Sequence, residues 1–231
     1  MSNSSLVQEG LKKSGDWKYE TSAVRKSGIK FGGIKYMSFH IVADSCCELT
    51  ADMKKRGNIE IAPLTLEVGG ESILDDETFD QKYFLKRVAE CPECPKSACP
   101  SPDYFRKSFL NGAERCYAVT LSAQLSGSYN SAVLGANLAQ EENEDLKIHV
   151  FNSRSASIGE TLIVKKIVEC EEAGMSFERV VETVELYIST QHTYFVLENL
   201  ETLRKNGRLS KAKALVASAL KIKPVMGATS E

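Results

Sequence analysis

The stretch Val119 to Ala132, with the sequence VTLSAQLSGSYNSA, decides how the rest of the chain is interpreted. An apolar run from Cys116 to Leu121 predicts a buried strand, and Tyr129 to Glu141 has the spacing of a helix. The turn between them, Ser122 to Ser128, is called the cradle below. Its small residues and hydroxyls should lie beside the unpaired N–H groups of a helix start, which favours a bound carboxylate or phosphate. The alternative is that a serine of the turn only caps the helix.

Composition is typical of a globular protein with a sizeable core. The chain has 231 residues, of which 42% are hydrophobic and 26% charged, enough for one large domain or two modest ones. A net charge of −2 gives no broad basic field, and no apolar run could span a bilayer, so we expect no nucleic-acid partner and no transmembrane segment. Seven cysteines and an N-terminus without a secretory signal favour a reducing cytoplasm over a disulfide framework.

Strands and helices alternate along the chain. Further strands are expected at Phe39–Ala43, at Ile59–Val68 with a break at Pro63, and at Lys147–Asn152. Further helices are expected at Leu49–Arg56, Thr78–Glu90, Ile158–Glu172 and Phe177–Thr190. Such alternation predicts a three-layer α/β/α domain with a mainly parallel sheet.

Two changes of character divide the sequence. Residues 1–36 are polar and show no hydrophobic period, so we expect a non-core N-terminal extension, with a docking tail as the alternative. Residues 37–190 are predicted to be the N-terminal α/β domain. Residues 191–231 restart the pattern with a strand at Thr193–Leu197, helices at 200–205 and 211–220, and a strand from Ile222. We expect these last residues to begin a smaller α/β domain that is truncated.

Polar residues also follow the first predicted strand. Asp44 and Ser45 lie between that strand and a helix, at the same kind of edge as the cradle. Ligands of parallel α/β sheets bind outside the carboxyl ends of the strands, so these two residues, with Ser122 and Asn130, are candidate lining residues. The alternative for Asp44 and Ser45 is again a helix cap.

A cysteine-rich loop precedes the cradle. Cys91, Cys94 and Cys99 contain a Cys-x-x-Cys spacing, which is half of a common zinc pattern, but only a distant cysteine or histidine could supply the missing ligand. We expect free thiols and no metal site. In the same loop, nearby prolines should stiffen the backbone that carries the hydroxyl of Ser97.

Six segments, taken together and in order, resemble the DegV family. They are Val42 to Ser45, Ser97 to Pro102, Leu121 to Ala132, Asn152 to Ala156, Asn206 to Lys213 and Lys221 to Pro224. The most specific pieces resemble the family's Ser-Gly-Thr/Ser-Tyr-Asn and Gly-Arg-Ile-Ser-Lys patterns. The resemblance implies a two-domain α/β protein that binds a long-chain fatty acid. It also implies a carrier that needs no cofactor and serves a separate fatty acid kinase catalytic subunit.

The resemblance also implies roles for individual residues. Ser126 and Gly127 match the family's head-group Ser-Gly, and Ser97 falls where the family usually has Thr, so these three are expected to bind the fatty-acid carboxylate. The tail would run into an apolar tunnel. Arg208 matches the arginine of the family's Gly-Arg turn and is expected to face the kinase.

Two departures from the family patterns concern the rim of the cradle. Ala98-Cys99 replaces Ser-Gln, and Ser122-Ala123-Gln124 replaces Ser-Ser-Gly. The family's C-terminal portion, with a His-containing stretch of the head-group site, is not matched, so ligand binding by this chain is itself an expectation that needs a test.

A second hypothesis is a serine hydrolase of small acyl or lipid esters, with Ser126 or Ser122 as nucleophile. A serine on a strand-to-helix turn suits that role, but the turn lacks the Gly-x-Ser-x-Gly spacing. The candidates for the base are His40, His149 and His192. The chain has no Walker-type loop and no local acidic cluster for Mg²⁺ and ATP, which favours a carrier whose chemistry belongs to the partner.

Overall fold

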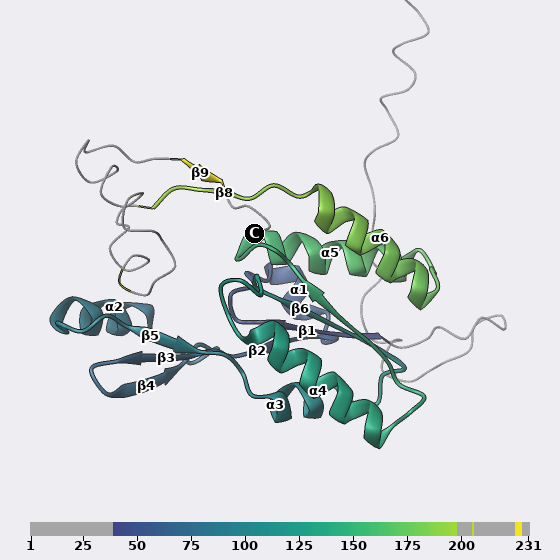
Figure 1. The fold of residues 1–231 in the computed structure, drawn as a ribbon, viewed down its shortest axis with the longest axis horizontal. Coiled ribbons are helices and arrows are strands. Elements are labelled where there is room, and N and C mark those ends of the chain that lie inside the picture. The colour runs from purple at the N-terminus through teal and green to yellow at the C-terminus, as the bar shows by residue number, and fades with distance from the viewer. Residues whose placement is uncertain (1–38, 198–204, 206–224, 228–231) are drawn as a thin grey trace, which may run out of the picture. The chain divides into compact units, whose positions relative to one another are not determined.

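The computed structural model describes residues 39–197, 205 and 225–227 (Figure 1). Its main sheet is parallel and has the strand order β2-β1-β6-β7. The four strands are β1 (Phe39–Asp44), β2 (Ile59–Ala62), β6 (Arg115–Thr120) and β7 (Lys147–Asn152). The first strand, β1, lies inside this sheet, with β2 on one side of it and β6 on the other.

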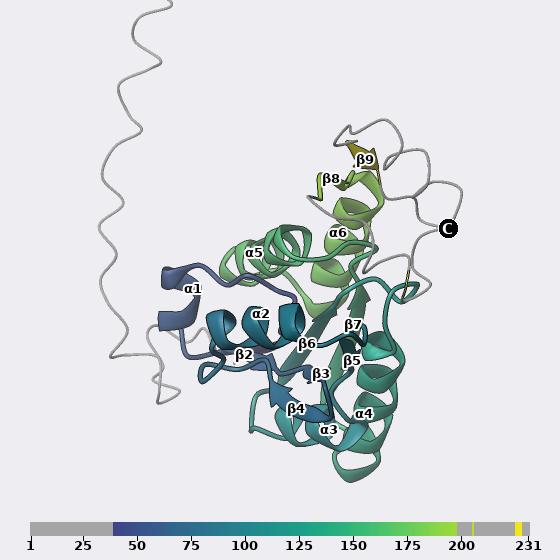
Figure 2. The ribbon, with the colours of Figure 1, turned by 90° about the vertical axis from the view of Figure 1, so that its left-hand side faces the viewer.

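Helices cover both faces of the main sheet, as Figures 1 and 2 show. Successive side chains of a strand point to opposite faces, which divides the core into two clusters. Val42 and Ala118 pack on the side of α3 (Pro102–Phe109) and α4 (Ser128–Glu142). Ile41 and Val119 pack on the side of α5 (Ile158–Glu172) and α6 (Phe177–Thr190), where α1 (Ala51–Lys55) contributes Met53. The predicted three-layer arrangement is confirmed.

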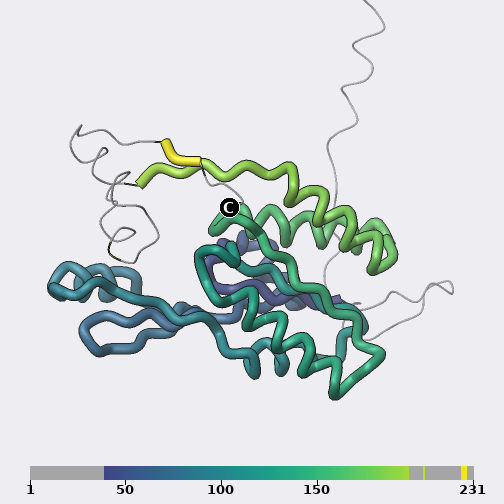
Figure 3. Tube along the Cα trace, viewed as in Figure 1, coloured from purple at the N-terminus to yellow at the C-terminus, as the bar shows by residue number. Residues whose placement is uncertain are grey.

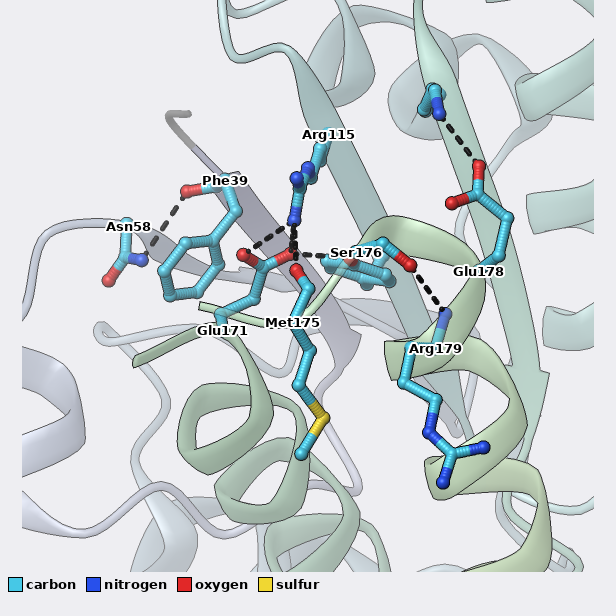
Figure 4. Close-up of polar contacts among 10 residues, drawn as sticks. Phe39, Asn58, Arg115, Glu171, Met175, Ser176, Glu178 and Arg179 are labelled. Carbon is cyan, nitrogen blue, oxygen red and sulfur yellow. Dashed lines mark hydrogen bonds and ion pairs between the residues drawn. The ribbon is translucent and has the colours of Figure 1, made fainter. Parts of the chain in front are cut away.

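A buried ionic network ties the amino end of β6 to the end of α5 (Figure 4). Arg115 Nη1 lies 3.1 Å from both carboxylate oxygens of Glu171 and donates to the Met175 carbonyl at 2.9 Å. The Tyr117 hydroxyl donates to the same Glu171 carboxylate at 2.5 Å. The Arg115 and Glu171 side chains are only 10% and 4% exposed. Because partly satisfied buried charges are costly, this network depends on all its members being present.

A second, antiparallel sheet has the order β4-β3-β5. It consists of β3 (Thr65–Val68), β4 (Glu71–Leu74) and β5 (Lys96–Ala98), and α2 (Gln81–Glu90) lies between β4 and β5 in the sequence. Figure 3 follows the chain from β2 into this small sheet and back through β5 to α3. The strand expected over Ile59–Val68 is therefore two strands in two sheets, and Pro63 lies at the division.

Helix α3 was not expected from the sequence. Ser101 caps it by accepting the Tyr104 N–H at 3.1 Å, and Pro102 occupies the first turn, where its missing N–H costs nothing. α3 packs tightly on α4, because a Cβ atom on Gly135 would lie 2.6 Å from the Pro102 carbonyl oxygen and 2.7 Å from Phe105 Cβ. Glycine is thus required where the two helices cross.

Other expected elements lie partly or wholly outside the described residues. Strand β8 (Tyr194–Phe195) falls within the expected strand at Thr193–Leu197, and it pairs with β9 (Met226–Gly227). Residues 1–36 and the helices expected at 200–205 and 211–220 are not described beyond Lys205, so the domain boundaries stay predictions. In the part of the chain that is described, no helix has the length and apolar character needed to cross a membrane.

Candidate functional site

The candidate site lies at the carboxyl edge of the main sheet. Strands β1, β6 and β7 end there at Asp44, Thr120 and Asn152. After β1 the chain turns to β2 on one side, whereas β6 follows on the other side, so the edge between β1 and β6 is a topological switch point. Loops diverge at such points and leave room for a ligand.

The cradle is held at this edge by backbone hydrogen bonds. The Ser122 N–H donates to the Ser155 carbonyl at 2.8 Å, and the Ala123 N–H donates to Asn152 Oδ1 at 3.1 Å. Within the turn, Leu125 N–H and Ser126 N–H both donate to the Ser122 carbonyl, at 2.8 and 3.2 Å. The cradle is therefore a tight turn anchored to the loop after β7, and it gives the start of α4 a fixed position.

The hydroxyls of the cradle lie at the start of α4. The cap residue of this helix is Gly127, which has no side chain to offer, and Ser126 Oγ accepts the Ser128 N–H at 3.2 Å. Ser126 Oγ also lies 3.3 Å from Ser128 Oγ. Ser126 thus satisfies one N–H of the helix start, as the capping alternative proposed, but its hydroxyl proton is still able to turn toward a ligand. The helix start favours negative charge there.

Ser97 lies on the small sheet, where β5 pairs Ser97 with Leu66 of β3. The segment that follows it reaches the start of α4, because the Ser131 hydroxyl donates to the Pro100 carbonyl at 2.5 Å. A Cβ atom on Gly127 would lie 3.3 Å from Cys99 Sγ. The structure therefore brings the loop after Ser97 against the cradle. Both Ser97 and Asn130 are exposed, and Asn130 is in the first turn of α4.

Asp44 and Ser45 connect loops at the edge and do not cap a helix. Asp44 is fully buried, and its carboxylate accepts the Leu121 N–H at 2.9 Å and the Cys46 N–H at 3.2 Å. Ser45 Oγ donates to Asp75 Oδ2 at 2.7 Å and accepts the Leu64 N–H at 3.1 Å. The capping alternative is wrong for both, because Thr50 caps α1. Ser122 is also buried, and its hydroxyl oxygen accepts the Gln124 N–H at 3.3 Å.

Glu160, in the first turn of α5, is a residue of this edge that the sequence interpretation missed. It is fully buried, and its carboxyl group, the Asp44 carboxyl group and the Cys46 thiol have atoms within 4.8 Å of one another. Burial, followed by the negative charge of Asp44, raises the pKa of Glu160 well above its usual value. Burial also raises the pKa of the Cys46 thiol, so this cysteine resists forming the thiolate that binds metal ions. Asp44 and Glu160 therefore form a buried pair of acids, called the acid pair below, in which burial disfavours the ionised form of Glu160.

The geometry does not favour the serine hydrolase hypothesis. Two of the candidate bases already contact a glutamate. His40 Nε2 lies 3.2 Å from a carboxylate oxygen of Glu60, and His149 Nε2 lies 3.1 Å from one of Glu185. The backbone of a nucleophile elbow has positive φ at the serine, and neither candidate nucleophile, Ser122 or Ser126, has it. Ser157 does, with φ 58° and ψ −124°, but its hydroxyl donates to Glu48 at 2.6 Å.

All seven cysteines are free, including those of the Cys-x-x-Cys loop. In the residues that the structure describes, Cys91, Cys94 and Cys99 do not gather with other metal-binding side chains.

A surface hollow of ≈ 260 Å³, lined by Phe109 and Leu146 among others, lies at the amino edge of the sheet, away from the cradle. Arg208 lies outside the described residues.

Comparison with known proteins assigns the family. The model described as "Uncharacterised protein, DegV family" matches residues 38–230. The chain belongs to the DegV family. The resemblance inferred from the sequence is therefore confirmed. A DegV domain-containing protein of Streptococcus pneumoniae is 38% identical over 191 residues, which cover 82% of this chain and 68% of that protein.

Solved DegV structures share the fold. A DegV family protein from Ruminococcus gnavus with vaccenic acid is 55% identical, with a TM-score of 0.79 over 84% of this chain and 69% of that one. The fatty acid kinase (Fak) B3 protein of Streptococcus pneumoniae, loaded with linoleic acid, is 36% identical, with a TM-score of 0.76 over the same shares. A fatty-acid-binding DegV family protein from Thermus thermophilus is 28% identical, with a TM-score of 0.73 over 84% and 69%.

Proposed function

We propose that this chain binds a long-chain fatty acid and presents its carboxylate to the catalytic subunit of a fatty acid kinase, in the cytoplasm, for phosphorylation to acyl phosphate. The observation that carries the proposal is the cradle at the switch point of a DegV fold. There, the start of α4 and the Ser126 hydroxyl oxygen that accepts its Ser128 N–H lie at the edge where such sheets bind ligands. Similar solved proteins carry fatty acids, which supports the same ligand class here.

The carboxylate is proposed to rest on Ser126, Gly127 and Ser97. Ser126 contributes a hydroxyl donor, and Gly127 lets the ligand approach the backbone at a helix cap without a side chain. Ser97 would add a second hydroxyl from the small sheet, whose following loop contacts the cradle. Charge-assisted bonds of this kind contribute about 1.5–3 kcal/mol each.

The fatty-acid tail is proposed to enter an apolar tunnel that begins at the same edge. Leu125, Ile158 and Leu162 are large apolar side chains of the cradle and of the first turns of α5, and each is at least 39% exposed. Exposed apolar side chains beside a polar head-group site suit an acyl chain, because each buried methylene contributes about 0.8 kcal/mol.

The ligand class can be tested first, by mass spectrometry of lipid extracted from the purified chain. We then expect Ser126→Ala to weaken palmitate binding roughly 10- to 150-fold, which corresponds to one charge-assisted bond. Ser97→Ala should act in the same direction, and the double variant should lose less than the sum if both hydroxyls hold one head group. Ser72→Ala, an exposed serine of the same small sheet, is the control. Unchanged affinity in Ser126→Ala would remove the cradle from the site.

The partner is tested through Arg208, which is proposed to face the kinase. A guanidinium suits a phosphate or an acidic surface, so Arg208→Ala should reduce acyl phosphate formation with kinase and ATP while leaving fatty-acid affinity largely intact. Arg179→Ala is the control, because Arg179 is an exposed arginine that pairs with Glu182 on α6. Lost affinity together with normal turnover at saturating ligand would contradict the kinase-facing role.

A further inference from the structure

The acid pair formed by Asp44 and Glu160 lies directly behind the cradle. Asp44 ends β1, and Glu160 lies in the first turn of α5. The pair therefore joins β1 to a helix on one face of the main sheet, whereas α4 lies on the other face. Both side chains are completely buried, and their carboxyl oxygens lie within 4.8 Å of each other. Two carboxylates this close and this deeply buried cannot both be ionised without a large cost.

The hydrogen-bond donors around the pair decide which group holds the proton. Asp44 accepts N–H bonds from Leu121 and Cys46. By contrast, no donor from the described residues reaches either carboxyl oxygen of Glu160. A fully buried carboxylate without a donor is strongly disfavoured, whereas a protonated Glu160 can donate to Asp44. Glu160 is therefore the acid of the pair and Asp44 the ion.

The titratable groups that face Glu160 are acidic or neutral. Asp44, Cys46 and Cys47 face Glu160 from the end of β1 and the loop after it. Glu48, in the same loop, accepts a hydrogen bond from Ser157, the residue that precedes α5. Burial and these negative neighbours raise the pKa of Cys47 to about 12 and that of Cys46 further, so both thiols stay neutral. Among the described residues, the acidic groups around Glu160 thus work together to hold its proton.

This proton has a consequence for the cradle. The hydroxyls of the cradle lie next to the pair, because Ser126 Oγ is 3.3 Å from Ser128 Oγ at the start of α4 and Ser128 is among the residues that interact with Asp44. An arriving carboxylate needs only the Ser126 hydroxyl to turn toward it. If Glu160 lost its proton, a second buried negative charge would lie behind the site and oppose the ligand.

We infer that Glu160 is a positioning residue of the head-group site, which keeps a single negative charge behind the cradle. The inference rests on the proposed function, because it assigns Glu160 to the site that binds the fatty-acid carboxylate. It adds that fatty-acid binding and proton retention by Glu160 are coupled. Binding of the anion must then favour the protonated form, and ionisation of Glu160 must weaken binding.

The first test compares fatty-acid affinity against pH in the wild type, Glu160→Gln and Glu169→Gln. Glutamine imitates the protonated acid and cannot ionise, and Glu169 is an exposed glutamate of the same helix. Above the pKa of Glu160, the wild-type Kd should rise by up to about tenfold per pH unit relative to Glu160→Gln, which corresponds to one proton per ligand. Glu169→Gln should follow the wild type. Parallel pH profiles for the wild type and Glu160→Gln would overturn the inference.

A second test needs no folded variant and no ligand. Carboxyl ¹³C NMR of the ligand-free wild type, with labelled glutamate, should show one glutamate that stays protonated where the exposed glutamates have all ionised. If no glutamate titrates above the ordinary value of about 4.3, the inference is overturned. Glu160-dependent uptake of Zn²⁺ at neutral pH would also overturn it, because a metal would then replace the proton. A wild type that binds no fatty acid at any pH refutes the proposed function. In that case the NMR result still shows whether Glu160 keeps its proton.

Discussion

Removal of the Glu171 side chain should destabilise the chain far more than removal of the neighbouring Glu172 side chain. Glu171 is 4% exposed and accepts hydrogen bonds from Arg115 and from the Tyr117 hydroxyl. Glu172 is 45% exposed and pairs with Arg56 at 2.8 Å. The two residues are adjacent on one helix and have the same chemistry, so the comparison contrasts a buried network with a more exposed ion pair.

The expected magnitude follows from what Glu171→Ala leaves behind. The buried Arg115 guanidinium would lose its carboxylate and keep its hydrogen bond to the Met175 carbonyl, at 2.9 Å, and the Tyr117 hydroxyl would lose its acceptor. Breaking a buried pair from one side costs about 3–5 kcal/mol, and the carbonyl bond should keep the loss near the lower end. Glu172→Ala removes a surface pair, which is worth about 0–1 kcal/mol. Against a total stability of about 5–15 kcal/mol, only the first loss is large.

Urea unfolding followed by circular dichroism would measure both losses. Tyr117→Phe gives an intermediate case, because it removes one bond to the same carboxylate and keeps the ion pair, at a cost of about 1.5–3 kcal/mol. The order Glu171→Ala, then Tyr117→Phe, then Glu172→Ala is expected. Equal losses for the two glutamates would refute the argument that the buried network anchors β6 to α5.

Three further predictions follow from other contacts. Gly135→Ala should cost about 1–3 kcal/mol in urea unfolding, because the new methyl group has no room between α3 and α4, whereas the exposed Asn137→Ala on the same helix should cost nothing. Glu160 binds its proton more tightly when folded, so stability should fall as pH rises above about 4.3, by up to about 1.4 kcal/mol per pH unit, and Glu160→Gln should remove this slope. Lys147 lowers the pKa of Glu178 to about 2, so the stability from this pair is present above pH 4.5 and lost toward pH 2; Lys147→Ala should raise that pKa in an NMR titration.

The main sheet and its long helices were predictable because their hydrophobic periods are strong. The expected strand at Lys147–Asn152 and the helices at Ile158–Glu172 and Phe177–Thr190 have the same bounds in the structure. The two helices bury apolar residues at helical spacing, such as Ile163 and Ile167 of α5 and Val180 and Val184 of α6, and such long periodic segments leave few alternatives. Helix α3 was missed because its prolines indicated a loop, although Ser101 followed by Pro102 is also a typical helix start.

The small sheet was harder to predict for a different reason. β5 has only three residues, all exposed, so its sequence carries no hydrophobic alternation. Its pairing depends on β3, which is separated from β5 by β4 and α2. The position of Ser97 relative to the cradle is therefore a tertiary property, and no local pattern around Ser97 specifies it.

The same distinction explains why the serines of the cradle were found and Glu160 was not. Hydroxyls in a strand-to-helix turn are a local pattern, and the backbone alone gives that pattern an affinity for anions. Glu160 has a local signal too, because it falls on the apolar face of α5 with Ile163, Val164 and Ile167, where a charged residue should not be buried alone. Its partner, however, is Asp44, and only the strand order that puts β1 beside β6 brings the two together. A glutamate on a buried helix face thus indicates that a partner exists, and the sheet topology identifies it.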